Sequence, residues 1–219
     1  MTTSFHIVYQ HHDFLVLNKP SALSVHKDNQ EYGLLEQLAQ ATGYKKLWLV
    51  HRLDKATSGL LILAKSAQSA ATFQQLFAQK AITKHYIALA QGKPKKKQGL
   101  IVGDMQKARN GSWRLSLERN NPAITRFYSV SVAPHLRLYH LLPKTGKTHQ
   151  LRVAMKSLGV PILGDERYGG ECADRTYLHA YCLQFEYNGQ KIEVRCNPTC
   201  GQWFSNTQVQ QAIADLAIT

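Results

Sequence analysis

One carboxylate stands inside a dense polar segment. Residues 51–59, with the sequence HRLDKATSG, place Asp54 among a histidine, an arginine, a lysine and two hydroxyl side chains. Positive neighbours favour the ionised form of a carboxylate, which a nucleophile or a general base requires. A continuous apolar run at residues 59–64 predicts that a strand buried on both faces follows directly. Asp54 is therefore a candidate catalytic residue beside a buried strand.

The same segment can also be interpreted as an ordinary polar loop. In that case Asp54 would cap the N–H groups of a turn, while Arg52 and Lys55 would simply be solvated. We favour the catalytic interpretation because Asp54 adjoins a strand that should be buried.

Strand and helix patterns surround this segment and alternate irregularly along the chain. Apolar residues at helical spacing predict helices at residues 34–41, 66–81, 149–158 and 206–216. Short apolar or alternating runs predict strands at residues 14–19, 47–50, 59–64, 85–90, 100–102, 112–117, 124–132, 136–142, 177–185 and 191–196. We expect Ser66 and Thr148 to cap the second and third helices. Because strands come in runs rather than one before every helix, the pattern predicts an α+β fold.

The composition predicts one globular domain with a polyanionic partner. Of the 219 residues, 44% are hydrophobic and 19% charged, which is an ordinary balance for a protein with a substantial core. We therefore expect a single domain over residues 1–219. Lysines and arginines number 27 against 14 aspartates and glutamates, a net charge of +13 that favours nucleic acid or an anionic membrane surface.

Other features disfavour a membrane, disulfides and metal. No uncharged apolar run approaches the roughly 20 residues that span a bilayer, and residues 1–19 lack the pattern of a signal peptide. We therefore expect a cytoplasmic protein that does not bind membranes. The irregular spacing of Cys172, Cys182, Cys196 and Cys200 predicts thiols rather than disulfides. The last two are spaced more loosely than zinc ligands usually are, so we expect no metal.

Four ordered segments resemble the RluA family of RNA pseudouridine synthases. Residues 50–65, VHRLDKATSGLLILAK, resemble the catalytic motif of that family. Residues 16–26, VLNKPSALSVH, resemble its opening strand and turn, and residues 84–92, KHYIALAQG, its tyrosine-bearing strand. Residues 145–155, TGKTHQLRVAM, followed by residues 159–165, GVPILGD, resemble its third motif. One short motif would be weak, but four in the family's order make the resemblance specific.

The resemblance implies the pseudouridine synthase fold, a mixed and largely antiparallel sheet in two halves with flanking helices and a central active-site cleft. It makes Asp54 the catalytic aspartate, Tyr86 the tyrosine that stacks on the uracil, and Arg152 the arginine that pairs with the aspartate. Arg52 matches the arginine that fills the space left by the extruded base. No segment resembles an N-terminal S4 RNA-binding module, so we expect the catalytic domain itself to recognise the target.

Further RNA contacts are expected from other polar residues of these motifs and from basic surface. The motif residues are His51, Lys55, Lys147, His149 and Gln150. The candidates for phosphate contacts are Lys93, Lys95, Lys96, Lys97, Lys107, Arg109, Arg114 and Arg119. The run from Lys93 to Lys97 can equally be a solvated hairpin tip.

The implied reaction explains these residue types. Converting uridine to pseudouridine breaks the bond between C1′ and N1 and joins C5 to C1′ without a change of oxidation state, so we expect no cofactor. It needs an ionised carboxylate, an apolar and aromatic slot for the detached base, and exclusion of water. Asp54 could attack C1′, add to C6 or remove the C2′ proton, and the sequence leaves these routes open. Because a stacked base must first be flipped out, a loop or bulge of structured RNA is favoured.

The leading hypothesis is therefore site-specific isomerisation of uridine in ribosomal or transfer RNA. We expect a monomer, because no heptad pattern or large apolar stripe demands a partner. One alternative is a noncatalytic RNA-binding or RNA-folding protein, against which the intact Asp54, Tyr86 and Arg152 argue. Another is a nucleoside or glycoside hydrolase, but glycosidases usually need two carboxylates and the sequence offers one strong candidate.

Overall fold

The chain divides into two compact units, each built from strands with helices packed on them. The computed structural model describes residues 6–23 and 34–218. One unit comprises Met1–Thr83 and Ala180–Asn197, and the other Lys84–His179 and Pro198–Thr219. The strands pair largely in antiparallel fashion, which confirms the predicted α+β class. That the whole chain forms one catalytic domain with a central cleft stays a prediction.

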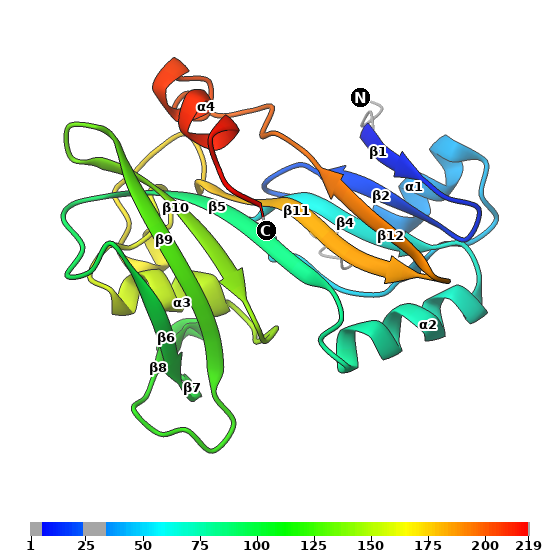
Figure 1. Cartoon of the computed structure of the whole chain (residues 1–219), viewed down its shortest axis with the longest axis horizontal. Helices are drawn as coiled ribbons and strands as arrows, with labels where there is room; N and C mark the ends of the chain where they lie inside the picture. Colours follow the sequence, from blue (N-terminus) through cyan, green and yellow to red (C-terminus); the bar gives the residue numbers. More distant parts are fainter. Residues whose placement is uncertain (1–5, 24–33, 219) are drawn as a thin grey trace. The chain divides into compact units, whose positions relative to one another are not determined.

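The first unit is a sheet with two helices (Figure 1). Its strands follow the order β1 (His6–Gln10), β2 (Phe14–Lys19), β4 (Ser58–Ala64), β11 (Leu178–Tyr187) and β12 (Gln190–Arg195), and β3 (Trp48–Leu49) also pairs with β4. The pairs β1–β2, β2–β4, β3–β4 and β11–β12 are antiparallel. The helices are α1 (Leu34–Thr42) and α2 (Ala67–Ala78), of which α2 packs against β4.

Aromatic packing and a buried central strand hold this unit together. The ring centroids of Phe14, Phe73, Phe185 and Tyr187, from β2, α2 and β11, lie between 5.0 and 5.8 Å apart. Aromatic rings at such distances contribute beyond their buried area. Every residue of β4 is buried, as its continuous apolar run predicts.

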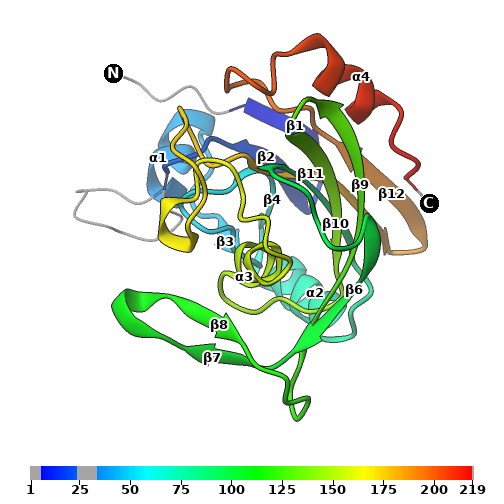
Figure 2. The ribbon, with the colours of Figure 1, turned by 90° about the vertical axis from the view of Figure 1, so that its left-hand side faces the viewer.

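The second unit is a four-strand antiparallel arrangement with a separate hairpin. Its strands follow the order β5 (Thr83–Gln91), β10 (Leu136–Pro143), β9 (Ala123–Ala133) and β6 (Gln98–Gly103). A hairpin of β7 (Met105–Lys107) and β8 (Trp113–Leu115), joined by the 3₁₀ turn η1 (Arg109–Gly111), lies beside helix α3 (Gln150–Ser157) (Figure 2). The turn η2 (Glu166–Tyr168) follows α3, and α4 (Thr207–Ala214) packs against β9 and β10.

Most predicted elements are confirmed, with three differences. Strands β1 and β7 were not predicted. Ser66 caps α2 as expected, its hydroxyl accepting the N–H of Ser69. The prediction that Thr148 caps the third helix is wrong, because α3 begins at Gln150 after His149 in a left-handed conformation, with φ of 56° and no side-chain cap. The reason is the Gln150 side chain, whose Oε1 accepts the Lys147 N–H and so closes a turn before the helix.

Some predictions fall outside the described residues or concern features other than the fold. Residues 24–26, the end of the first family segment, lie outside the described residues. The four cysteines are free thiols, as predicted. Within residues 6–23 and 34–218, no helix combines the length and apolar character needed to cross a bilayer. In the same part of the chain, no three His, Cys, Asp or Glu side chains are grouped as a metal site would need.

Candidate active site

Asp54 lies in the loop between β3 and β4. Its carbonyl accepts the Thr57 N–H at 3.0 Å, which closes a tight turn immediately before β4. The Asp54 side chain is half-buried, whereas those of Arg52 and Lys55 are exposed. Leu53 is buried between them and anchors the loop in the core. The loop therefore holds a carboxylate at a fixed point with basic side chains in water beside it.

A buried lysine ties this loop to the end of β2. Lys19 is 0% exposed, and its Nζ donates to the carbonyls of Pro20 and Leu23, both at 2.8 Å. A longer bond of 3.4 Å reaches the carbonyl of Lys55, next to Asp54. Hydrogen bonds from a charged group are stronger than neutral ones, and a buried ammonium must make them. Lys19 therefore stabilises the backbone of the loop.

His51 is held against β4 and α2. Its Nε2 accepts the N–H of Ile62 at 2.8 Å, and its ring lies 4.8 Å from that of Phe77. Because Nε2 accepts, the proton of the neutral ring lies on Nδ1. Its predicted contact with RNA stays a prediction.

Tyr86 lies in the middle of β5, in the second unit, and is 9% exposed. In the sheet register it is opposite Leu141 of β10, which is opposite Phe127 of β9. Residues opposite each other in a sheet point to the same face, and Thr125 shares that face because it is two residues from Phe127. Gln150 of α3 donates to the hydroxyl of Thr125 at 3.0 Å. The helix that carries Arg152 therefore packs on the face of the sheet to which Tyr86 belongs.

Arg152 belongs to a buried network on α3. Its Nε and Nη2 each donate to a carboxylate oxygen of Asp165 at 2.7 Å, and its Cζ lies 4.9 Å from the centre of the Tyr168 ring. The exposed fractions of Arg152 and Asp165 are 7% and 1%, so both charges are removed from water. A bidentate pair and an aromatic face together fix the plane of a guanidinium.

The other predicted residues of the third motif surround the start of α3. The Nδ1 of His149 is 2.7 Å from the Tyr168 hydroxyl, and the Nζ of Lys147 donates to Oδ1 of Asn121 at 2.7 Å. Gln150 is buried and uses its amide within the protein, donating to the carbonyl of Ile124 at 3.1 Å. These bonds orient the turn before the helix. Their predicted RNA contacts stay predictions.

The structure brings together the predicted residues within each unit. The first unit holds His51, Arg52, Asp54 and Lys55 in one loop, and the second holds Tyr86 on the sheet face that α3 covers. The predicted pairing of Asp54 with Arg152 involves both units and stays a prediction.

Burial lowers the pKa of Lys84, two residues before Tyr86 on the same side of β5, and its Nζ donates to the Thr145 carbonyl at 3.4 Å.

Comparison with known proteins identifies the family. The family model described as RNA pseudouridylate synthase matches residues 13–157, a span that contains Asp54, Tyr86 and Arg152. A Haemophilus influenzae protein named "Uncharacterized RNA pseudouridine synthase" is 59% identical over 208 residues, which cover 94% of this chain and 93% of that protein. The chain belongs to the RNA pseudouridylate synthase family.

More distant relatives and solved structures agree with this assignment. The "Ribosomal large subunit pseudouridine synthase C" of Rickettsia conorii is 33% identical over 88% of this chain and 67% of its own length. The protein of the same name from Haemophilus ducreyi is 34% identical over 83% of this chain, which spans 61% of that protein. The solved "Human RNA Pseudouridylate Synthase Domain Containing 1" has a TM-score of 0.77 and 25% identity, covering 99% of this chain and 97% of that one. The predicted fold, the reaction class and RNA as partner are thus confirmed.

Two residues of the site were not predicted from the sequence. Asp165 closes the GVPILGD segment, so its place in a motif was a signal, but its pairing with Arg152 was not visible in the sequence. Tyr168 follows three residues later with no comparable signal. Both became recognisable only through their contacts with the arginine.

Proposed function

We propose that this protein isomerises specific uridines of large-subunit ribosomal RNA, with Asp54 as the catalytic carboxylate. One observation carries the role of Asp54: it is the single carboxylate of the loop between β3 and β4, held half-buried by a backbone turn inside the segment that matches the family. The names of the two relatives at 33% and 34% identity support ribosomal RNA as the substrate.

The reaction breaks the bond between C1′ and N1, turns the retained uracil, and joins C5 to C1′. The proton on C5 then leaves to solvent. Asp54 acts in the ionised form, whether it attacks C1′, adds to C6 or removes the C2′ proton. Tyr86 retains the detached base against its ring, because an aromatic face binds a base of any orientation in its plane.

Arg152 and Arg52 would have distinct roles. The guanidinium of Arg152, kept in one plane by Asp165 and Tyr168, would pair with Asp54 and keep its carboxylate oriented. Arg52 would stack in the space left by the flipped uridine and offset part of the cost of unstacking. The exposed side chain of Arg52 supports this role. The side chain of Lys55 is also exposed, which supports a contact with phosphate.

The remaining motif residues would act around the target nucleotide. His51, Lys147 and His149 would contact RNA directly. Gln150, whose amide bonds within the protein, would shape the turn that presents Lys147. We further propose that the protein acts as a cytoplasmic monomer, which light scattering on the purified chain would test.

The decisive experiment measures release of tritium to water from RNA labelled at uridine C5. Wild type, Asp54→Asn and Asp215→Asn would be compared, the last as a matched change at an exposed aspartate after α4. We expect release by wild type and Asp215→Asn and at least a thousandfold less by Asp54→Asn, since the nucleophile or base is lost. Equal rates for all three would exclude Asp54 as the catalytic group.

The substrate class needs a separate comparison. Labelled ribosomal RNA and transfer RNA would be supplied in turn at equal uridine concentration, and the modified position mapped. We expect release from ribosomal RNA. Release from transfer RNA alone would overturn the substrate while leaving the reaction intact, and RNA binding without release from either would favour the noncatalytic alternative.

A further inference from the structure

A single hydroxyl connects the β7–β8 hairpin with the start of α3. The Tyr168 hydroxyl accepts the backbone N–H of Trp113, the first residue of β8, at 3.1 Å. On its other side it lies 2.7 Å from Nδ1 of His149, the residue before α3. The same side chain is 2% exposed and presents its ring to the guanidinium of Arg152.

The two hydrogen bonds of this hydroxyl are compatible with each other. A phenol oxygen can accept one hydrogen bond and donate one, so it can accept from Trp113 and donate to Nδ1 of His149 when the imidazole carries its proton on Nε2. Burial raises the pKa of Tyr168, which keeps the phenol protonated and able to donate. Both bonds together fix the ring, and the ring position in turn limits where the Arg152 guanidinium can lie.

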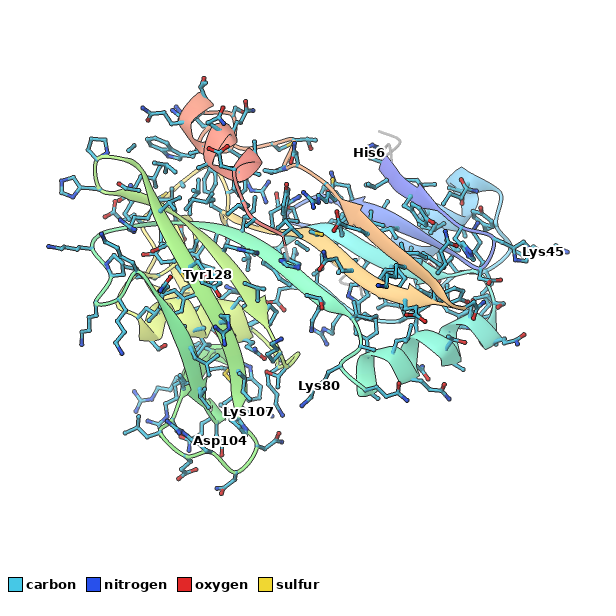
Figure 3. All side chains as sticks on the ribbon, viewed as in Figure 1. His6, Lys45, Lys80, Asp104, Lys107 and Tyr128 are labelled. Carbon is cyan, nitrogen blue, oxygen red and sulfur yellow. The ribbon has the colours of Figure 1, made fainter. Side chains whose placement is uncertain are left out.

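The hairpin at the other end of this connection has the character of a phosphate-binding surface. Residues 105–115 contain no acidic residue, and the side chains of Lys107, Arg109 and Arg114 are exposed. Figure 3 labels Lys107 on this hairpin. A second bond, from Nη1 of Arg167 to the carbonyl of Asn110 at 3.0 Å, ties the hairpin turn to η2, on which Tyr168 lies. Two hydrogen bonds therefore link the hairpin to η2 and Tyr168.

We propose that Tyr168 is a positioning residue that couples RNA bound by the β7–β8 hairpin to the orientation of Arg152. This inference rests on the proposed function, because it assigns the hairpin to the RNA substrate and Arg152 to catalysis. RNA phosphates on the hairpin hold β8 in place, the Trp113 N–H keeps the Tyr168 hydroxyl in place, and the ring keeps the arginine in its working orientation. Binding energy from a remote part of the RNA thereby contributes to the rate rather than to affinity alone.

Tyr168→Phe tests the hydroxyl while it keeps the ring under Arg152. We expect kcat for tritium release to fall about tenfold, with KM for RNA changed less than about twofold. Tyr139→Phe is the matched control, since it removes the hydroxyl of another buried tyrosine in the same unit, one with which no group in the described part of the chain meets hydrogen-bond geometry. An unchanged kcat in Tyr168→Phe would overturn the proposal.

The coupling itself is tested by combining this change with Lys107→Ala, Arg109→Ala and Arg114→Ala. With Tyr168 intact, we expect the hairpin variant to raise KM about tenfold and to lower kcat about threefold. In the Tyr168→Phe background only KM should rise, because the hydroxyl that links β8 to the ring beside Arg152 is already absent. A purely structural role of Tyr168 predicts the same kcat effect in both backgrounds, and that result would overturn the coupling.

Amide hydrogen exchange at Trp113 gives a readout that does not depend on activity. We expect faster exchange in Tyr168→Phe than in wild type or Tyr139→Phe, because its N–H loses its acceptor. Unchanged exchange would contradict the tether. If wild type released no tritium from any RNA, the proposed function would fail, whereas the exchange result would still decide whether the hydroxyl holds the hairpin.

Discussion

The surroundings of Asp54 and of Arg152 are stabilised in different ways. The loop that carries Asp54 is stabilised by a tight backbone turn, by the buried strand β4 that follows it, and by hydrogen bonds from Lys19 to backbone carbonyls. Arg152 is held by side chains, namely a bidentate carboxylate and an aromatic ring. The first arrangement should be sensitive to changes that displace backbone, and the second to changes of charge.

The largest loss of folding stability is expected from a change at Gly59, where β4 meets β11. Gly59 has φ of +107°, and a Cβ added to it would overlap the carbonyl oxygen and nitrogen of Ala180. Backbone cannot move aside as a flexible side chain can, so Gly59→Ala should lower the free energy of unfolding by more than about 5 kcal/mol. Urea denaturation of the purified variant checks this.

Gly189→Ala is the matched control for Gly59→Ala. Gly189, in the turn between β11 and β12, also has positive φ, +79°, but nothing lies within 4 Å of its added Cβ. It carries the conformational cost alone, and we expect a loss of about 1 kcal/mol. Equal losses at the two glycines would show that conformation, rather than the close approach to Ala180, decides the effect.

The second largest effect is expected from neutralising Asp165. Asp165→Asn keeps the shape of the side chain but removes the carboxylate charge that the buried Arg152 guanidinium contacts at 2.7 Å, which should cost about 4 kcal/mol in the free energy of unfolding. Glu193→Gln makes the same chemical change in the Arg195–Glu193 pair, whose side chains are 45% and 41% exposed. That variant should lose less than about 1 kcal/mol. Similar losses in the two variants would mean that the buried Arg152–Asp165 pair contributes no more to stability than the exposed Arg195–Glu193 pair.

The same contrast explains which parts of the site could be predicted from the sequence. Asp54 was recognisable because its loop and strand are contiguous: the polar segment at residues 51–59 runs directly into the apolar run of β4. Arg152 was recognisable only as a motif position. Its partners Asp165 and Tyr168 lie beyond the end of α3, and nothing in the spacing shows that the chain returns to the arginine.

The errors in the predicted fold have local physical causes instead. Thr148 has the preferred residue type for a helix cap, but the Gln150 side chain takes over the turn, so the helix starts later. Strand β7 has three residues, too few for an alternating pattern. Both errors arise within short segments, where a neighbouring side chain competes for the turn or too few residues carry the pattern.

A pH-dependent loss of stability is expected in the second unit. Burial, followed by the neighbouring His85, lowers the pKa of His140 from 6.5 to about 4, and the two rings are joined by a hydrogen bond of 2.9 Å. The folded state therefore disfavours protonation. The contribution of neutral His140 to the free energy of unfolding is complete above pH 6.5. It is lost as the pH falls towards 4, by at most about 3 kcal/mol.

Urea midpoints between pH 7.5 and pH 4 test this expectation in wild type and His140→Phe. The variant has no group to protonate at this position, so its midpoint should fall less steeply with acid. His6→Ala, at an exposed histidine of β1, should keep the wild-type slope. A wild-type slope in His140→Phe would assign the acid sensitivity to other groups.

The smallest change in folding stability is expected from Tyr139→Phe. Comparison with Tyr168→Phe shows whether a buried hydroxyl stabilises the fold through its hydrogen bonds. Tyr139 is 0% exposed, and among the described residues no group meets hydrogen-bond geometry with its hydroxyl, although the Arg137 guanidinium interacts with it electrostatically. Burial raises its pKa to about 12, and Arg137 offsets only part of that rise. Since an unpaired buried hydroxyl costs free energy rather than contributing it, Tyr139→Phe should change the free energy of unfolding by less than about 1 kcal/mol, in the stabilising direction. Tyr168→Phe, which removes a hydroxyl with two partners, should destabilise by about 1 to 3 kcal/mol in the same measurement. Equal losses in the two variants would mean that the phenol rings, and not the hydrogen bonds of Tyr168, stabilise the surroundings of Arg152.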